Sequence, residues 1–256
     1  MQKIKMTIGG LMILALMGTS CKSHYEMSGI SRTRILVDKR YDAQPDAGAS
    51  AFMVPYKHDV DSIMSPVVGQ IARYMAAKKP ESELSNLLAD ILMWAGKLYQ
   101  EKPDFSVYNM GGIRAAFAQG EVTYGDVLDV APFENKIAFV TLSGEKVLEL
   151  FRQMAMTGGE AVSHGVQMVI TSDGKLKSVR INGEEVNPQA SYRVASIDYL
   201  IQGNDRLEAF KAKTDVNSPQ EVSNNLRFII MDYFREQAAK GIVVDSRIEG
   251  RCVVED

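Results

Sequence analysis

Apolar residues recur at intervals of three and four positions in three stretches of the chain, and this spacing predicts helices that each bury one face. The first predicted helix covers residues 51–77, although Pro66 must end or kink it because proline lacks the N–H that a helix interior needs. The second covers about 82–100. The third covers about 221–240, and Gly241 follows it as the residue type that most often ends a helix.

Segments rich in β-branched and aromatic residues lie between these helices and are bounded by turn-forming dipeptides. Asp173-Gly174 and Asn182-Gly183 separate three such segments, which predicts a hairpin or meander. Ser143 has the residue type of an N-cap and predicts a helix over 143–156. The predicted strands cover residues 34–37, 136–142, 165–171, 176–181 and 192–196.

The order of these elements predicts an α+β fold with helices packed on mixed sheets, because no regular strand–helix–strand repeat is present. At 256 residues, 46% of them hydrophobic, the chain is long enough to bury a core in one sizeable domain or two small ones. Its net charge of −3 and the lack of a basic run argue against a nucleic-acid polymer as a partner.

The first 20 residues have the pattern of an export signal. Lys3 and Lys5 precede an uncharged apolar run that is too short to cross a bilayer. Small residues then lead to Cys21, which resembles a bacterial lipoprotein signal cut before a lipidated cysteine; the alternative is an ordinary secretory signal with an incidental cysteine. We therefore expect an exported, membrane-anchored lipoprotein at the periplasmic face or cell surface. Its expected parts are residues 1–20 (signal peptide), 21–50 (tether and first strand) and 51–256 (folded domain).

A turn in the middle of the chain carries residue types suited to holding a ligand. Gly111 and Gly112 permit positive φ and would let backbone N–H groups converge on one point, as at sites that hold anions or sugars. Asn109 and Arg114 flank this pair with an amide and a guanidinium. The alternative is an ordinary Gly-Gly turn between strands, which is about as common.

Two aromatic residues stand in polar, turn-rich surroundings where a core aromatic side chain is not expected. If Phe133 and Tyr199 face each other about a base thickness apart, they would clamp a planar ring, and such stacking contributes roughly 1–3 kcal/mol per base. The alternative is partly buried packing at strand ends, which is the commoner arrangement for an isolated aromatic residue.

Three blocks of the chain, taken in order, resemble the C-terminal, substrate-binding domain of the 5′-nucleotidase family. The first is a helical patch over 80–90 that contains Asn-Leu-Leu-Ala-Asp. The second, over 108–135, contains Asn-Met-Gly-Gly-Ile-Arg, Gly-Glu-Val-Thr-Tyr-Gly-Asp and Pro-Phe-Glu-Asn. The third, over 192–205, begins Tyr-Arg-Val-Ala-Ser-Ile-Asp-Tyr and ends Gly-Asn-Asp. The resemblance spans about residues 59–207 and implies a layered αββα arrangement with mixed sheets.

The resemblance also implies a site for a nucleoside or nucleotide. Phe133 and Tyr199 occupy the positions of the family's base-stacking pair. Arg114 matches an arginine on the sugar-phosphate side, where the alternative is a surface cation. Asp205 matches the acid that accepts hydrogen bonds from ribose hydroxyls, where the alternative is a solvated turn acid. The implied substrate-binding set is Asn109, Gly111, Gly112, Arg114, Phe133, Tyr199 and Asp205.

The chain departs from the family pattern at several positions. Pro80 stands near the place of an expected phosphate-side arginine, and Met110 and Ser85 replace glycines. Asn204 and Arg206 stand where glycines flank the acid; asparagine there is a mild change because it visits left-handed φ readily. Arg206 is a hypothetical source of the missing positive charge.

Full-length 5′-nucleotidases carry an N-terminal metallophosphatase domain that holds two metal ions, and its Asp-x-His and Gly-Asn-His signatures do not occur in these 256 residues. His24, His58 and His164 have no metal-ligand spacing, and Cys252 is the one cysteine besides Cys21. We therefore expect this chain to bind without hydrolysing, with no metal or cofactor of its own and two divalent metals only in a partner metallophosphatase. The alternative is a non-catalytic nucleoside-binding or scaffolding surface lipoprotein.

Overall fold

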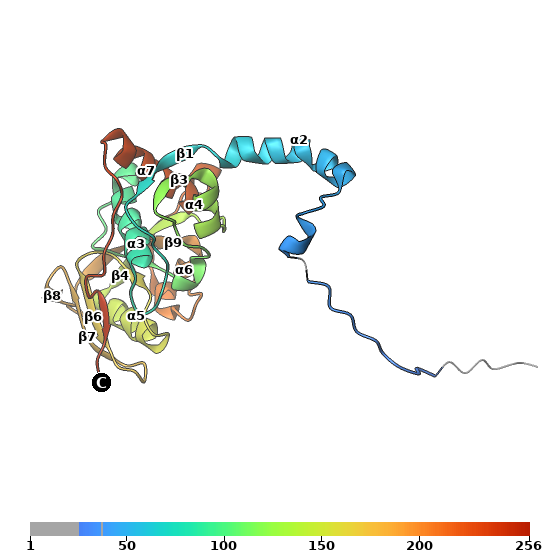
Figure 1. Ribbon diagram of the computed structural model, residues 1–256. Coiled ribbons are helices and arrows are strands. Elements are labelled where there is room, and N and C mark those ends of the chain that lie inside the picture. Colours follow the sequence, from blue (N-terminus) through green and yellow to red (C-terminus); the bar gives the residue numbers. More distant parts are fainter. Residues whose placement is uncertain (1–25, 37) are drawn as a thin grey trace, which may run out of the picture. The chain divides into compact units, whose positions relative to one another are not determined.

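The computed structural model describes residues 26–36 and 38–256. Its main compact unit is Met53–Asp256, and the described residues ahead of Met53 belong to a separate unit (Figure 1). The expected signal peptide and Cys21 lie outside the described residues. Within the part that is described, none of the helices combines the length and the apolar character needed to cross a membrane.

Helices and strands alternate along the described chain. The helices are η1 (Lys39–Tyr41), α2 (Ala47–Met64), α3 (Glu83–Ala95), η2 (Gly96–Tyr99), η3 (Met110–Gly112), α4 (Tyr124–Val130), α5 (Gly144–Met156), α6 (Asp198–Ile201), η4 (Glu208–Ala212), η5 (Val222–Asn224) and α7 (Leu226–Ala239). The strands are β1 (Val67–Ile71), β2 (Phe105–Tyr108), β3 (Gly120–Thr123), β4 (Ile137–Ser143), β5 (Ala161–Val162), β6 (Val166–Ile170), β7 (Leu176–Ile181), β8 (Glu184–Glu185), β9 (Ser191–Ile197), β10 (Thr214–Asn217) and β11 (Cys252–Val254).

Two elements near the N-terminus differ from the prediction. Residues 34–36 form no strand, and Val37 lies outside the described residues. The helix predicted over 51–77 ends with α2, which has no buried residue, and the chain then forms β1. Val68 and Ile71 are three residues apart, a spacing typical of one helix face. Both are nevertheless buried in β1, which pairs with β3. Pairing with a distant strand decided the conformation here, and the register of that pairing shifts between Val67 and Gly69, so the burial pattern of β1 does not follow simple alternation.

The strands form mixed sheets, which confirms the predicted α+β class. The five-stranded sheet has the order β10-β4-β9-β2-β5, and within it β2 runs parallel to β9 while β4 runs antiparallel to β9. A four-stranded sheet has the order β11-β6-β7-β8, and β1 pairs with β3 in a two-stranded sheet. The predicted hairpin is present: Asn182 and Gly183 have φ of 53° and 86° and join β7 to β8.

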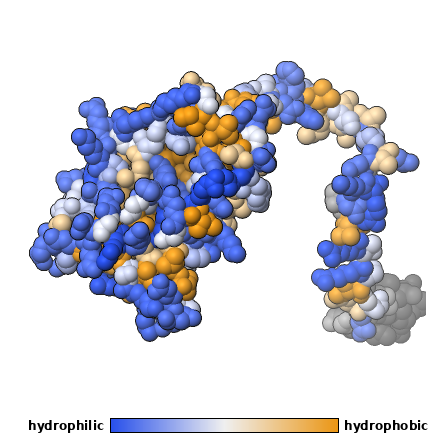
Figure 2. Space-filling view, turned by 60° about the vertical axis from the view of Figure 1, so that its left-hand side comes forward, coloured by the Kyte–Doolittle hydropathy of each residue, from blue (hydrophilic) through white to orange (hydrophobic). Residues whose placement is uncertain are grey.

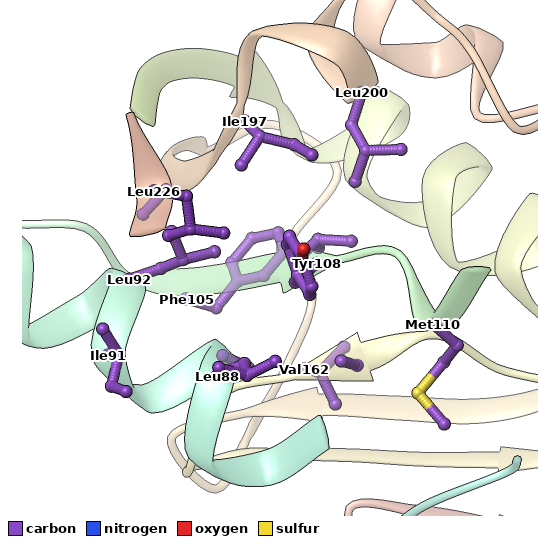
Figure 3. Packing of buried hydrophobic residues seen from close by; sticks show 14 of the residues in the cluster. Leu88, Ile91, Leu92, Phe105, Tyr108, Met110, Val162, Ile197, Leu200 and Leu226 are labelled. Carbon is purple, nitrogen blue, oxygen red and sulfur yellow. The ribbon is translucent and has the colours of Figure 1, made fainter. Parts of the chain in front are cut away.

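Helices α3, α5 and α7 form within the ranges that the sequence predicted. The hydroxyl of Ser82 caps α3, and Ser143 caps α5, in each case by accepting a backbone N–H of the first turn. α3 packs on β2 and β5, whereas α5 contacts β4 and β9 of the larger sheet and β7 of the second sheet. Figure 3 shows part of the buried core around β2, where the labelled side chains include Leu88, Ile91, Leu92, Phe105 and Tyr108. Figure 2 shows a mostly hydrophilic surface in which apolar residues form small, separate areas.

Candidate functional site

One cavity of about 280 Å³ brings together all of the residues that the sequence assigned to ligand binding. Its lining consists of Asn109, Gly111, Gly112, Arg114, Phe133, Asn135, Tyr199 and Asp205. Asn135 was missed, although it belongs to the Pro-Phe-Glu-Asn block that drew attention to this region. The eight residues come from three segments that are about 20 and about 65 positions apart in the chain.

The sheet explains why these segments meet. β2 and β9 are parallel neighbours, so the segments that follow them, η3 and α6, emerge at the same edge of the sheet. β4 is antiparallel to β9, with Ile137 opposite Ile197, so the loop that leads into β4 reaches this edge as well. The cavity therefore lies at the carboxyl ends of two parallel strands, where open sheets commonly place their ligands.

Asp205 is the one carboxylate in the lining, and two side chains hold it. Its Oδ2 accepts a hydrogen bond from Nδ2 of Asn109 at 2.7 Å, and its Oδ1 accepts one from the hydroxyl of Tyr199 at 2.8 Å. The bond to Asp205 raises the pKa of the Tyr199 phenol, because the carboxylate favours the protonated hydroxyl. Each carboxylate oxygen can accept a further hydrogen bond, so the carboxylate is fixed in place with acceptor capacity left.

The turn that carries Asp205 differs from the prediction in one detail. Asp205 and Arg206 have left-handed φ of 54° and 65°, whereas Asn204 was expected to adopt it and does not. Instead, Nδ2 of Asn204 donates a hydrogen bond to the Tyr199 carbonyl at 2.8 Å and closes the turn onto α6. The substitution of Asn204 for glycine is therefore accommodated by a side-chain contact and not by its backbone conformation.

Of the two glycines, Gly112 is required for its small size. Neither Gly111 nor Gly112 has positive φ, so that expectation was wrong, because the chain forms the short 3₁₀ turn η3. A Cβ on Gly112 would lie 2.7 Å from Oδ1 of Asn109, closer than a carbon and an oxygen can pack. The predicted convergence of several N–H groups on a ligand is also not seen, because the N–H groups of Met110, Gly112 and Ile113 each donate to a protein oxygen.

Glu160 holds the start of this turn, and sequence reasoning missed it. Its carboxylate is buried, with 5% of the side chain exposed, and it accepts the N–H of Met110 at 2.6 Å. Its other oxygen accepts from Nζ of Lys79 at 2.7 Å. A lone glutamate 50 positions from the turn gives no motif, so only the folded chain reveals this contact.

The two aromatic side chains are partly exposed to the cavity, Phe133 by 43% and Tyr199 by 38%. Arg114 places its guanidinium carbon 5.3 Å from the centroid of the Phe133 ring, within the range of a cation–π contact. Oδ1 of Asp198 accepts the backbone N–H groups of Tyr199 and Lys136, at 2.8 and 3.0 Å. One carboxylate thus ties the Tyr199 segment to the loop that bears Phe133.

The N-terminus of α7 supports the same loop from a third side. The carbonyl of Pro132 accepts from Nη2 of Arg227 at 2.7 Å, and the carbonyl of Asn135 accepts from the N–H of Leu226 at 2.9 Å. Nζ of Lys136 donates to the side chain of Asn225 and to the Glu134 carbonyl. The backbone on both sides of the Phe133 ring is therefore anchored.

The helical patch over 80–90 serves the fold. Asp90 accepts two hydrogen bonds from the guanidinium of Arg251, at 2.8 and 2.7 Å, and Arg251 is 3% exposed. Nδ2 of Asn86 donates to the Arg247 carbonyl at 2.9 Å. These polar residues of the motif fasten the C-terminal segment to α3 and do not line the cavity.

Two other residues from the sequence analysis also lie outside the lining. Asp126 accepts the N–H and the hydroxyl of Thr123 and forms a capping box at the start of α4. Arg206 is exposed and follows Asp205 in the chain, but it is not among the residues that line the cavity. The proposal that Arg206 supplies a missing charge stays a prediction.

The cavity does not fit a two-metal centre. Asp205 is the single acidic side chain in the lining, which holds no histidine or cysteine. Both Asp205 oxygens already accept hydrogen bonds within the protein. Across residues 26–36 and 38–256, no group of three or more His, Cys, Asp and Glu side chains is arranged to hold a metal ion.

A protein-family model and several known proteins match the sequence of this chain. The family model described as "5′-nucleotidase, C-terminal domain" matches residues 67–212. A 5′-nucleotidase of Vibrio cholerae is 34% identical over 112 residues, 42% of this chain and 20% of that protein. A 5′-nucleotidase of Vibrio vulnificus is 25% identical over 194 residues, 74% of this chain and 34% of that protein. The chain therefore spans about a fifth to a third of the length of these relatives.

Solved structures share the fold. The crystal structure of a 5′-nucleotidase precursor from Thermus thermophilus has a TM-score of 0.69 and 24% identity, covering 82% of this chain and 43% of that chain. The NAD nucleotidase of Haemophilus influenzae has a TM-score of 0.61 and 19% identity, covering 82% and 42%. The predicted fold class is confirmed by this likeness.

Proposed function

Because this chain belongs to the family of the 5′-nucleotidase C-terminal domain, we propose that it binds the nucleoside part of a nucleotide and presents the phosphate ester to a metallophosphatase on a separate chain. The observation that carries the proposal is the cavity in which two partly exposed aromatic side chains accompany a fixed carboxylate. This combination suits a ligand with a flat ring and hydroxyl groups.

Each part of the cavity has a role in this proposal. Phe133 and Tyr199 stack on the base, which contributes roughly 1–3 kcal/mol per base. Asp205 accepts hydrogen bonds from the ribose hydroxyls through the acceptor capacity that Asn109 and Tyr199 leave. A total near 4 kcal/mol corresponds to a dissociation constant of about 1 mM. Weak binding is expected, since the partner would supply the rest of the contacts.

The hydrolytic step needs groups that the cavity does not offer. Uncatalysed hydrolysis of a phosphate monoester is slow enough that enzymes accelerate it up to ~10²¹-fold. Two metal ions on the partner would supply that chemistry by stabilising the attacking and leaving oxygens. The contribution of this chain is to bind and orient the nucleoside.

Binding is tested by titrating the full chain with adenosine in a calorimeter. Phe133→Ala and Tyr199→Ala should each weaken binding by about fivefold or more, as loss of one stacking contact implies. Tyr74→Ala is the matched control, because Tyr74 is exposed but does not line the cavity. Unchanged affinity in both cavity variants would remove the stacking assignment.

The proposed action of this chain together with a separate metallophosphatase is tested by mixing the two proteins. Where an adjacent gene encodes a metallophosphatase, adding this chain to that enzyme should raise the rate of phosphate release from a nucleotide. No change in rate would favour the alternative, a non-catalytic nucleoside-binding or scaffolding lipoprotein. The control is the Phe133→Ala variant, which should stimulate less than the unmodified chain.

We also propose that Cys21 carries lipid and holds the protein at a membrane surface. The support is the charged start, the short apolar run and the small residues ahead of Cys21. Growth with a labelled fatty acid should label the protein, and Cys21→Ser should abolish the label and release the protein from membranes. An unlabelled protein would contradict this assignment.

A further inference from the structure

The charges around the cavity point to a narrower ligand class. Resting on the function proposed above, we propose that the free chain selects neutral nucleosides, and that a 5′-phosphate adds no affinity. The lining holds one cation, Arg114, and one anion, Asp205, beside two amides. The site is therefore close to electrically neutral, whereas a phosphate monoester carries about −1.5 to −2 charges near pH 7.

Arg114 is poorly placed to hold a phosphate strongly. Its guanidinium lies over the Phe133 ring, at 5.3 Å from the centroid. The side chain is exposed, so water and salt screen its charge. Asp205 lines the same cavity, and its negative charge acts on a phosphate with the opposite sign to that of Arg114.

The other cations near the Phe133 loop are engaged with protein acceptors. Nζ of Lys136 donates to Asn225 and to the Glu134 carbonyl. Nη2 of Arg227 donates to the Pro132 carbonyl. None of these side chains lines the cavity, and Glu134 adds a negative charge to the same loop.

The backbone of η3 does not present a set of free N–H groups to the cavity. Anion sites without many basic side chains usually rely on N–H groups that converge on the ligand. In η3 the N–H groups of Met110, Gly112 and Ile113 already donate to protein oxygens.

The cavity volume, about 280 Å³, lies just below the ~300–1,000 Å³ typical of small-molecule sites, which favours a compact ligand.

The test compares adenosine with adenosine 5′-monophosphate by calorimetry of the full chain at about 50 and 300 mM salt. We expect the dissociation constants to agree within about threefold, or the monophosphate to bind more weakly, with little salt dependence. A monophosphate that binds tenfold more tightly, with salt-sensitive affinity, would overturn this inference and leave the proposed function standing. No binding of either compound would overturn the proposed function itself.

Asp205→Asn gives a second readout. Removing the negative charge should weaken adenosine binding several-fold and shift the ratio of affinities toward the monophosphate. Asp215→Asn is the matched control, because Asp215 is an exposed aspartate of β10 that also has left-handed φ, 48°, but does not line the cavity. A ratio that Asp205→Asn leaves unchanged would contradict the role of this charge.

Discussion

Replacing Glu160 with alanine tests whether this buried carboxylate, which does not line the cavity, positions the turn η3 that does. The change removes the acceptor of the Met110 N–H and the partner of Lys79. Breaking a buried ion pair by removing one partner costs about 3–5 kcal/mol. Because 38% of the Lys79 side chain is exposed and can be rehydrated, we expect the lower end, about 3 kcal/mol.

Glu160→Gln separates the two contacts of this carboxylate. Glutamine keeps an acceptor for the Met110 N–H but loses the charge that faces Lys79. We therefore expect a smaller loss of stability, about 1–2 kcal/mol, and near-normal binding. A typical domain is stable by about 5–15 kcal/mol, so both variants should fold.

Two measurements on each Glu160 variant distinguish support of the fold from positioning of the site. Urea unfolding, followed through the single tryptophan, Trp94, gives the free energy of unfolding. Calorimetric titration with adenosine gives affinity. A positioning role predicts that alanine lowers affinity about tenfold and that glutamine restores most of it. Glu208→Ala, at an exposed ion pair with Lys211, should change stability by less than about 1 kcal/mol. A destabilised alanine variant with unchanged affinity would refute the positioning role.

Two further predictions follow from contacts in the structure. Gly112→Ala places a Cβ 2.7 Å from Oδ1 of Asn109 and should lower the free energy of unfolding by about 1–3 kcal/mol in urea titrations, whereas Gly111→Ala, with open space around its Cβ, should change it little. Hydrogen bonds from Lys240, Lys97 and Trp94 lower the pKa of Glu236 to about 2, so stability from this group is present above its unfolded value near 4.5 and is lost as the pH falls through 2. Trp94 fluorescence should therefore change near pH 2 and not near 4.5, and Glu236→Gln should remove that change; a transition near 4.5 would contradict the assignment.

All but one of the residues that line the cavity, Asn135, were found from the sequence because they lie in short motifs. Arg114 and Phe133 each stand at a fixed place in such a motif, and the motifs occur in the family's order. Their supports could not be found this way. Glu160 reaches the turn from 50 positions away, and Arg227 reaches Pro132 from 95 positions away. Contacts of this kind depend on which strands are neighbours, and a motif does not contain that information.

The sequence by itself determined the elements whose stability is local. Helix α3 follows from apolar spacing, and α5 follows from the capping hydroxyl of Ser143. The Asn182-Gly183 hairpin follows from the φ values that those residues tolerate. The tertiary structure alone decided that β1 is a strand, because its partner β3 lies about 50 positions away. It also decided that three separate segments meet in one cavity, since parallel pairing of β2 with β9 places their ends at one edge of the sheet.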